Sequence, residues 1–311
     1  MANPPIAAPP AALHQRVGLV GRLDLPKRVT FAAAAMVVVL VALLLAFIGV
    51  NGTKIFAVPG QSIGTILGPT WAPSSTPAIF GILPFILGTL GVMIVAAIIA
   101  APLSIGLAVF MAEVAPPWAN AITRPAMEVF VGIPSVVYGF LGLTILVPFL
   151  AHNFAWLGFK VGYSWFAGSL VLAVMILPTV ASIAYDALLT IPAELRSASL
   201  ALGTTRWQTI RHILLPAARA GLLTAVVLGM MRAAGEALAV QMVIGNRPTI
   251  PTGLTDPMTT LTAQITLDMG NTVSGEAWNS ALWTMGLVLL LMSLSFVLLA
   301  RYLGRQRAVP S

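Results

Sequence analysis

Long apolar runs, separated by short polar stretches, are the main feature of this chain. A helix that crosses a hydrocarbon core of ~30 Å needs about 20 residues, and several runs reach that length. Backbone groups in lipid must bond within the protein, and no alternation typical of barrel strands is present, so helices are expected. The sequence therefore predicts an all-α, polytopic bundle of six transmembrane helices, at 29–50, 79–112, 126–150, 164–186, 218–245 and 281–303.

The stretches between the spans predict the remaining organisation. The start of the chain is rich in proline and alanine and is expected to be a disordered tail. No internal repeat is evident. The predicted parts are a tail (1–28), a first transmembrane helix (29–50), a loop on the opposite side of the membrane (51–78), a helical core (79–303) with a loop on the same side as the tail (187–217), and a second tail (304–311).

Composition supports a membrane protein and excludes several other classes. Hydrophobic residues make up 59% of the chain, charged residues 8%, and the mean hydropathy is +0.97. A soluble fold would need more charge to cover its surface, so lipid is the expected surrounding. The chain has no cysteine, which excludes disulfides and thiolate metal sites. Its net charge of +7 comes from residues that flank apolar spans, so we expect no nucleic-acid partner.

The distribution of lysine and arginine predicts the orientation. Only Arg232 lies inside a predicted span. The positive-inside rule places the richer side, with both termini, in the cytoplasm. That side carries Arg16, Arg22, Lys27, Arg28, Arg124, Arg196, Arg206, Arg211, Arg219, Arg301, Arg305 and Arg307. The other side carries Lys54, Lys160 and Arg247.

The segment 192–216 is polar for so apolar a chain, and its first half predicts a short helix. Pro192 suits a first helical position, and Glu194 is favourable in the first turn. Gly203 fits the position just after a helix end, where a left-handed residue is common.

The second half of this segment predicts another short helix. Thr205 and Gln208 have the spacing of a capping box. Leu215 and Pro216 should end the helix, because a residue before proline resists the α conformation. A polar helix with one apolar face is expected to bury that face against a partner protein, against the chain's own bundle, or among lipid headgroups. Trp207, Ile210, Ile213 and Leu214 fall near that face, and Arg206 lies off it.

Two charged residues lie within the fifth predicted span. Charges there cost roughly 2.5–3.5 kcal/mol each, so they should face protein, water or each other. Arg232 and Glu236 are four residues apart and would share a face of one helix, which permits an ion pair. Gly229 and Gly235 would allow close approach of another helix or a ligand. The pair is either structural or part of an anion site, because an arginine fork suits phosphate oxygens.

Other polar residues near the spans carry weaker signals. Pro134 frees backbone carbonyls in the third span, and Ser135 and Tyr138 could offer hydroxyl donors to a path. A kink that only serves helix packing is the alternative. Glu113 and Glu128 lie near span ends and are expected to be solvated.

The chain lacks the motifs of an enzyme. It has no G-x-x-x-x-G-K-[ST] loop for ATP, no nucleophile elbow, and only His14, His152 and His212, which have no metal-ligand spacing. We therefore expect no catalytic residue, no cofactor and no metal. Uphill transport would draw energy from another subunit or an ion gradient.

The polar segment resembles the EAA loop of ABC-importer permeases. Gly203 is followed after nine residues by Ile213, then by Leu215 and Pro216, as in that family. The family's Glu-Ala-Ala is replaced by Ser-Ala-Ser at 197–199. The resemblance implies a coupling helix that docks on a cytoplasmic ATPase. The residues expected to couple are Glu194, Ala198, Gly203, Thr205, Arg206, Trp207 and Pro216.

Four stretches narrow the resemblance to phosphate importers. They are MAEVAP (111–116), GIPSVVYGFLGL (132–143), ALGTTRWQTIRHILLPAA (201–218) and RAAGEALAVQMVIGN (232–246). Together they resemble the PstC-type permease more than the PstA-type, over about residues 79–303. The resemblance implies a type I ABC-importer permease fold in the bacterial inner membrane. It also implies that Arg232 and Glu236 matter for phosphate passage.

The resemblance further implies partners. These are a PstA-type sister permease, a PstB-type ATPase dimer and a PstS-type periplasmic binding protein. Three other functions remain open at this point. They are a permease for another oxyanion such as molybdate or sulfate, an ion-coupled carrier or channel without an ATPase, and a membrane scaffold or sensor.

Overall fold

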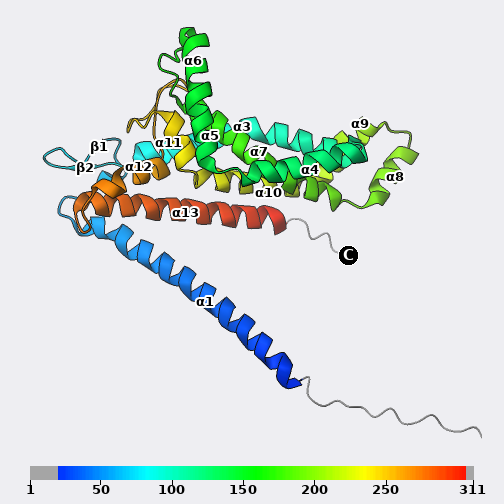
Figure 1. The fold of residues 1–311 in the computed structure, drawn as a ribbon, viewed down its shortest axis with the longest axis horizontal. Helices are drawn as coiled ribbons and strands as arrows, with labels where there is room; N and C mark the ends of the chain where they lie inside the picture. Colours follow the sequence, from blue (N-terminus) through cyan, green and yellow to red (C-terminus); the bar gives the residue numbers. More distant parts are fainter. Residues whose placement is uncertain (1–19, 306–311) are drawn as a thin grey trace, which may run out of the picture. The chain divides into compact units, whose positions relative to one another are not determined.

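A computed structural model of the protein describes residues 20–305, with side chains from 27 to 304 (Figure 1). Most of the predicted tail 1–28, and the tail 304–311 apart from its first two residues, lie outside the described residues. The chain divides into two units, the first ending at Gly49 and the second beginning at Val50.

A single long helix, α1 (Val20–Thr53), forms the described part of the first unit and continues into the second. It begins before residue 29, within the region predicted as a tail. Its apolar part is almost free of polar residues on every side, so the helix lacks a polar face. A helix that is apolar all round is typical of a membrane span.

The second unit is built from helices and one small hairpin. The 3₁₀ and π turns interrupt or extend several of the helices. The α-helices after α1 are α2 (Ile63–Ile66), α3 (Leu83–Val109), α4 (Pro117–Gly132), α5 (Ser135–Leu141), α6 (Val147–Asn153), α7 (Trp165–Leu189), α8 (Ala193–Ala201), α9 (Arg206–Thr209), α10 (Leu215–Ala234), α11 (Leu238–Ile244), α12 (Leu261–Asp268) and α13 (Ala277–Arg305). The hairpin pairs β1 (Trp71–Ala72) with β2 (Ile79–Phe80), antiparallel, with Trp71 opposite Phe80.

The prediction of six membrane-spanning helices is confirmed, and the boundaries of the third and fifth differ most from those predicted. Among the described residues, six helices are long and apolar enough to cross a membrane. The third lies at Ser135–Asn153 instead of 126–150, because the chain breaks at Ile133 and Pro134 between α4 and α5. The fifth lies at Arg206–Ala234 instead of 218–245, because α10 ends before Gly235.

The core of the second unit lies where α3, α7 and α10 pack together. Buried apolar side chains along α7, such as Leu172 and Ile176, form one continuous cluster with α3 and α11. Gly229 of α10 faces α7 directly, since a Cβ atom there would overlap the Val180 side chain. The close approach predicted at Gly229 is therefore confirmed. A second contact joins α3 to α12, where the Leu261 N–H donates to the Thr89 hydroxyl at 3.0 Å.

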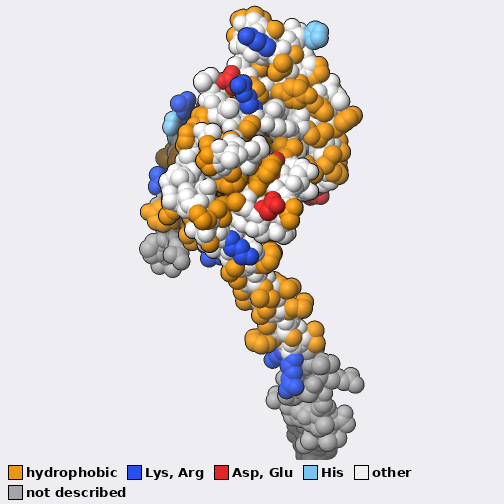
Figure 2. All heavy atoms as spheres, turned by 90° about the vertical axis from the view of Figure 1, so that its left-hand side faces the viewer, with side chains coloured by type: hydrophobic (Ala, Val, Ile, Leu, Met, Phe, Trp, Pro, Cys, Tyr) orange, Lys and Arg blue, Asp and Glu red, His pale blue; other side chains and the backbone are white. Residues whose placement is uncertain are grey.

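The two ends of this bundle differ in structure. Helices α8 and α9 lie at one end, and the hairpin, α11 and α12 lie at the other (Figure 1). Figure 2 looks onto the hairpin end and shows basic and acidic side chains in small separate groups between apolar ones. This end therefore carries no extended patch of one sign.

A tight turn at the hairpin end is organised by Asp256. Its carboxylate accepts hydrogen bonds from the Thr252 hydroxyl at 2.6 Å, the Thr252 N–H at 2.8 Å and the Gly253 N–H at 3.1 Å. These bonds, that of the Thr252 hydroxyl foremost, lower the pKa of Asp256 below its ordinary value of 3.8. Arg247 adds a smaller electrostatic contribution in the same direction.

The lowered pKa of Asp256 predicts a pH-dependent contribution to stability. A carboxyl with a lowered pKa stabilises the fold above its unfolded pKa, and this contribution is lost as the pH falls through the folded value. We expect Asp256→Asn to lower the melting temperature at neutral pH. The difference from the parent protein should shrink as the pH falls below ~4. Equal melting temperatures at neutral pH in a detergent thermal-shift assay would contradict this role.

Candidate functional site

A cavity of about 390 Å³ opens between α4, α7 and α10. Arg232, the basic residue that the sequence places inside a membrane span, lines this cavity. Helix α4 contributes Arg124, Met127, Glu128 and Val131, α7 contributes Pro178, Thr179, Ser182, Ile183 and Tyr185, and α10 contributes Arg232.

Two arginines face this cavity, and each contacts an uncharged group of α7. The Arg232 Nη1 donates to the Thr179 hydroxyl at 2.9 Å. The Arg124 guanidinium lies over the Tyr185 ring, with its central carbon 5.9 Å from the ring centroid. The ion pair found among residues 27–304 joins two other side chains, Arg196 and Glu113. The cavity therefore offers guanidinium donors to an anion.

The pairing that the sequence permits between Arg232 and Glu236 is absent from the described structure. Because α10 ends at Ala234, Glu236 lies beyond the last turn, and the two residues do not share one helix face. The Glu236 carboxylate instead accepts from the Ala239 N–H at 3.2 Å, at the start of α11. Its backbone carbonyl accepts from the Thr262 hydroxyl at 2.8 Å, which ties the helix break to α12.

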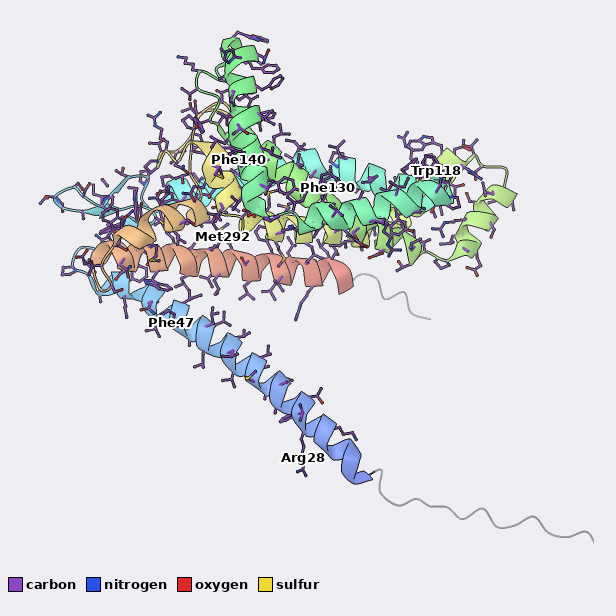
Figure 3. All side chains as sticks on the ribbon, viewed as in Figure 1. Arg28, Phe47, Trp118, Phe130, Phe140 and Met292 are labelled. Atoms are coloured by element: carbon purple, nitrogen blue, oxygen red, sulfur yellow. The ribbon has the colours of Figure 1, made fainter. Side chains whose placement is uncertain are left out.

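Ser135 and Tyr138 lie at a second helix break and do not line the cavity. Ser135 is the first residue of α5, directly after Pro134. The Tyr138 hydroxyl donates to the Phe130 carbonyl at 2.8 Å, across the break between α4 and α5. Figure 3 shows Phe130 on α4 and Phe140 on α5, on either side of this break. The cavity thus brings together Arg232 with residues that the sequence analysis did not select.

The missed residues left a signal in the sequence. Arg124 and Glu128 are four apart and share a face of α4. Thr179, Ser182 and Tyr185 recur every three residues in the second half of the largely apolar α7. Hydroxyls at that spacing lie close to one another along one side of a helix.

The polar segment at the other end of the bundle is built largely as predicted. Helix α8 begins one residue after Pro192, and Gly203 follows its end in the left-handed region, at φ +81°. The capping box is confirmed, because the Gln208 N–H donates to the Thr205 hydroxyl and the Thr205 N–H donates to the Gln208 side chain.

The predicted end of the second short helix at Pro216 is wrong. Helix α9 continues through a π-helical stretch, Ile210–Leu214, directly into α10. Proline blocks the ordinary bond to the residue four positions earlier, and a widened turn accommodates such a ring. Motion at α9 can therefore reach Arg232 along one continuous helix.

Only part of the apolar face predicted on the second short helix is buried. Ile210 and Leu214 are buried against the bundle, but Trp207 is 62% exposed and Leu202, in the preceding turn, is 85% exposed. The residues expected to couple are all exposed, namely Glu194, Ala198, Gly203, Thr205, Arg206, Trp207 and Pro216.

A buried hydroxyl cluster fixes the turn between α8 and α9. Ser199 lies within hydrogen-bond distance of the Thr204 hydroxyl at 2.8 Å and the Thr209 hydroxyl at 3.0 Å. Thr204 and Thr209 are themselves 3.1 Å apart. Ser199 occupies the last position of the Ser-Ala-Ser that replaces Glu-Ala-Ala, so its side chain has an internal structural role.

Arg196 ties α8 to the bundle. It pairs with Glu113 at 2.8 Å and donates to the carbonyls of Ile191 at 2.9 Å and Leu188 at 3.2 Å. The Glu113 side chain is only 13% exposed, so the expectation that Glu113 is solvated is wrong. Glu128 is exposed, but it faces the cavity.

Removing the Arg196 charge should loosen this attachment. We expect Arg196→Met to lower the free energy of unfolding by about 1–3 kcal/mol, because Glu113 and two carbonyls lose their donor. Chemical denaturation in mild detergent measures this difference. Arg211→Met is the matched control, since Arg211 is exposed on the same segment and has no ion pair within the described chain. Equal stability of the two variants would rule out the attachment.

Comparison with known proteins decides the family. The family model described as binding-protein-dependent transport system inner membrane component matches residues 104–309. The chain belongs to this family of ABC-transporter permeases. The permease is 52% identical over 285 residues to a probable ABC transporter permease, YqgH, of Bacillus subtilis, with 90% of each chain covered. It is 34% identical to the phosphate transport system permease PstC of Xylella fastidiosa, with 86% of each covered.

A solved structure shares the fold of this permease. A bacterial ABC transporter that imports the acidic polysaccharide alginate has a chain with a TM-score of 0.59 and 18% identity. The alignment covers 92% of this permease and 99% of that chain. The expected type I ABC-importer permease fold is confirmed, as is a multi-pass location in the inner membrane.

Proposed function

We propose that this permease carries inorganic phosphate across the bacterial inner membrane, past Arg232. The observation that supports this most is the cavity with two arginines and no paired carboxylate. A guanidinium presents a planar fork of donors that matches the oxygens of a phosphate. The PstC relatives, which are named as phosphate permeases, point to the same substrate.

In this proposal Arg232 contacts the anion directly, and Thr179 orients it. Glu236, Ser135 and Tyr138 border the path at the two helix breaks next to it. Glu236 would act by holding the start of α11, since its carboxylate bonds the Ala239 N–H. In another conformation of the transporter it would compete with the anion for Arg232.

The proposed orientation follows from the charge distribution, and the proposed coupling to ATP hydrolysis follows from α8 and α9. Both termini and the α8–α9 segment would lie in the cytoplasm, where most of the basic residues fall. The exposed Leu202 and Trp207 would dock on an ATPase, which hydrolyses ATP on a separate subunit. ATP-driven closure of that subunit would then pull on α9 and, through the continuous helix, on Arg232.

The proposed assembly has four kinds of subunit. This chain would pair with a PstA-type sister permease above a PstB-type ATPase dimer. A PstS-type binding protein would deliver phosphate to the hairpin end. The parts of this chain would be the core at 79–303, the coupling loop at 187–217, the loop at 51–78 and the two cytoplasmic tails.

The donors of the cavity also support a second candidate substrate, another oxyanion such as sulfate or molybdate. These donors are guanidinium and hydroxyl groups, which fit sulfate or molybdate as well as phosphate. The relative with 52% identity is named only as a permease, so its name does not choose between these anions.

Uptake by the reconstituted complex tests the substrate. Proteoliposomes that contain the four kinds of subunit should accumulate labelled phosphate only when ATP is supplied. Excess unlabelled phosphate should abolish the signal, and equal sulfate or molybdate should leave most of it. Stronger competition by sulfate or molybdate would assign the other anion, and accumulation without ATP would overturn the ATP-driven mechanism.

A further inference from the structure

We propose that Arg124 forms a second oxyanion station, through which the substrate passes after Arg232 on its way to the cytoplasm. This inference rests on the proposed function and extends it to residues of α4 and α7. Both arginines line one cavity, although they come from helices far apart in the sequence. In the sequence alone, Arg124 is one of the basic residues that predict the orientation.

The hydroxyl groups of α7 connect the two stations. Thr179 holds Arg232, Tyr185 stacks on Arg124, and Ser182 lies between them on the cavity wall. Tyr185 lies six positions after Thr179, which is a rise of about 9 Å along the helix. An anion that leaves Arg232 would thus meet a hydroxyl donor before it meets the second guanidinium.

The direction of passage follows from the position of Arg124 in the fold. Tyr185 lies in the last turns of α7, which ends at Leu189, just before α8. Arg124 lies in the first half of α4, which begins at Pro117. The α8–α9 end carries the segment that the proposed function places in the cytoplasm (Figure 1). Arg124 is therefore the station nearer to the cytoplasmic exit.

The charged groups that line the cavity favour release of the anion at Arg124 and its retention at Arg232. Glu128 lies one helical turn from Arg124 on α4 and also faces the cavity. Neither residue takes part in an ion pair within residues 27–304. A nearby carboxylate lowers the attraction of Arg124 for an anion. Arg232, whose hydrogen-bond partner is the neutral Thr179 hydroxyl, keeps its full attraction.

The ligand chemistry is that of a phosphate oxyanion. The cavity offers two guanidinium groups, three hydroxyls and a single carboxylate, which is a set dominated by donors. Free phosphate and the headgroup of an acidic lipid share this chemistry. Vesicles made only of zwitterionic lipid separate the two sources, because they contain no acidic headgroup.

A cysteine probe in the cavity tests Arg124 directly. The chain has no cysteine, so Ile183→Cys places one thiol in the cavity wall of this subunit. The reconstituted complex, in zwitterionic vesicles, is labelled with an anionic and a cationic thiosulfonate, and adducts of this chain are quantified by mass. We expect Arg124→Gln to lower the ratio of anionic to cationic labelling rates by roughly tenfold. Inorganic phosphate should slow anionic labelling more strongly in the parent than in Arg124→Gln, where Arg232 is the remaining guanidinium of the cavity.

Two further variants complete the test. Arg124→Lys keeps the charge and should restore most of the labelling ratio, which a purely structural role would not predict. Arg219→Gln is the matched control, because Arg219 is exposed on α10 and does not line the cavity. Equal ratios for Arg124→Gln and Arg219→Gln would overturn the inference, as would protection that requires acidic lipid.

This outcome is separable from that of the proposed function. If the parent complex accumulates no oxyanion in the uptake assay, the proposed function fails whatever the labelling shows. If the parent accumulates phosphate and Arg124→Gln does so at the same rate, only the second station is lost. A loss of phosphate accumulation of about tenfold or more in Arg124→Gln, with normal uptake in Arg219→Gln, supports it.

Discussion

Arg232→Gln should reduce ATP-driven phosphate accumulation by about tenfold or more in proteoliposomes. The substitution removes the charge and leaves a shorter polar side chain with an amide donor. A hydrogen bond from a charged donor contributes about 1.5–3 kcal/mol, and its loss corresponds to roughly ten- to 150-fold in rate if the bond acts on the moving anion. The Thr179 hydroxyl, which Arg232 now contacts, lies in the same cavity and can still bind water.

The control for this prediction is on the same helix. Arg219→Gln changes the same chemical group on α10 but outside the cavity, and it should transport as the parent does. Size-exclusion chromatography shows whether each variant still assembles with its partners. Normal phosphate uptake by an assembled Arg232→Gln complex would refute the role of Arg232 in the path.

Charged replacements at the exposed apolar surface of the α8–α9 segment should detach the ATPase. Leu202 and Trp207 are the most exposed large apolar side chains of this segment. Aromatic anchors at protein interfaces contribute 2 kcal/mol or more, so Leu202→Asp with Trp207→Asp should weaken the complex by about thirtyfold or more. The amount of ATPase that co-purifies with this chain in mild detergent measures the effect.

A matched pair of residues exists away from this segment. Trp156 and Leu157, in the short 3₁₀ helix Ala155–Leu157, are 79% and 50% exposed. Trp156→Asp with Leu157→Asp makes the same chemical change and should leave the ATPase bound. Equal loss of ATPase in both double variants would indicate general damage, and full retention in the first would exclude docking at α8 and α9.

The sequence predicted the helical spans because hydropathy is a local property of the chain. Two helix breaks were not predicted, for a physical reason. At Ile133–Pro134 and at Gly235–Ala237 the flanking residues are apolar on both sides, so the average hydropathy does not change where the helix stops. The turn at Gly203 and the cap at Thr205 were predictable, because each depends on neighbouring residues only.

The cavity could not be predicted in the same way. It depends on which faces of α4, α7 and α10 meet, and nothing near Arg232 in the sequence indicates Arg124 or Thr179. The continuation through Pro216 was also missed, since a proline usually ends a helix. The π-helical stretch Ile210–Leu214 accommodates the backbone hydrogen bond that Pro216 cannot make. The formation of this stretch depends on packing against the bundle.

Cross-linking from Leu202 tests the central claim most directly, namely that a separate ATPase drives this bundle through α8 and α9. Because the chain has no cysteine, Leu202→Cys carries a benzophenone maleimide at one known position. Illumination of native membranes should join this chain to the ATPase subunit, identified by mass, and the same probe at Trp156→Cys should not. Adducts from Leu202→Cys with lipid alone, with and without ATP, would contradict the account.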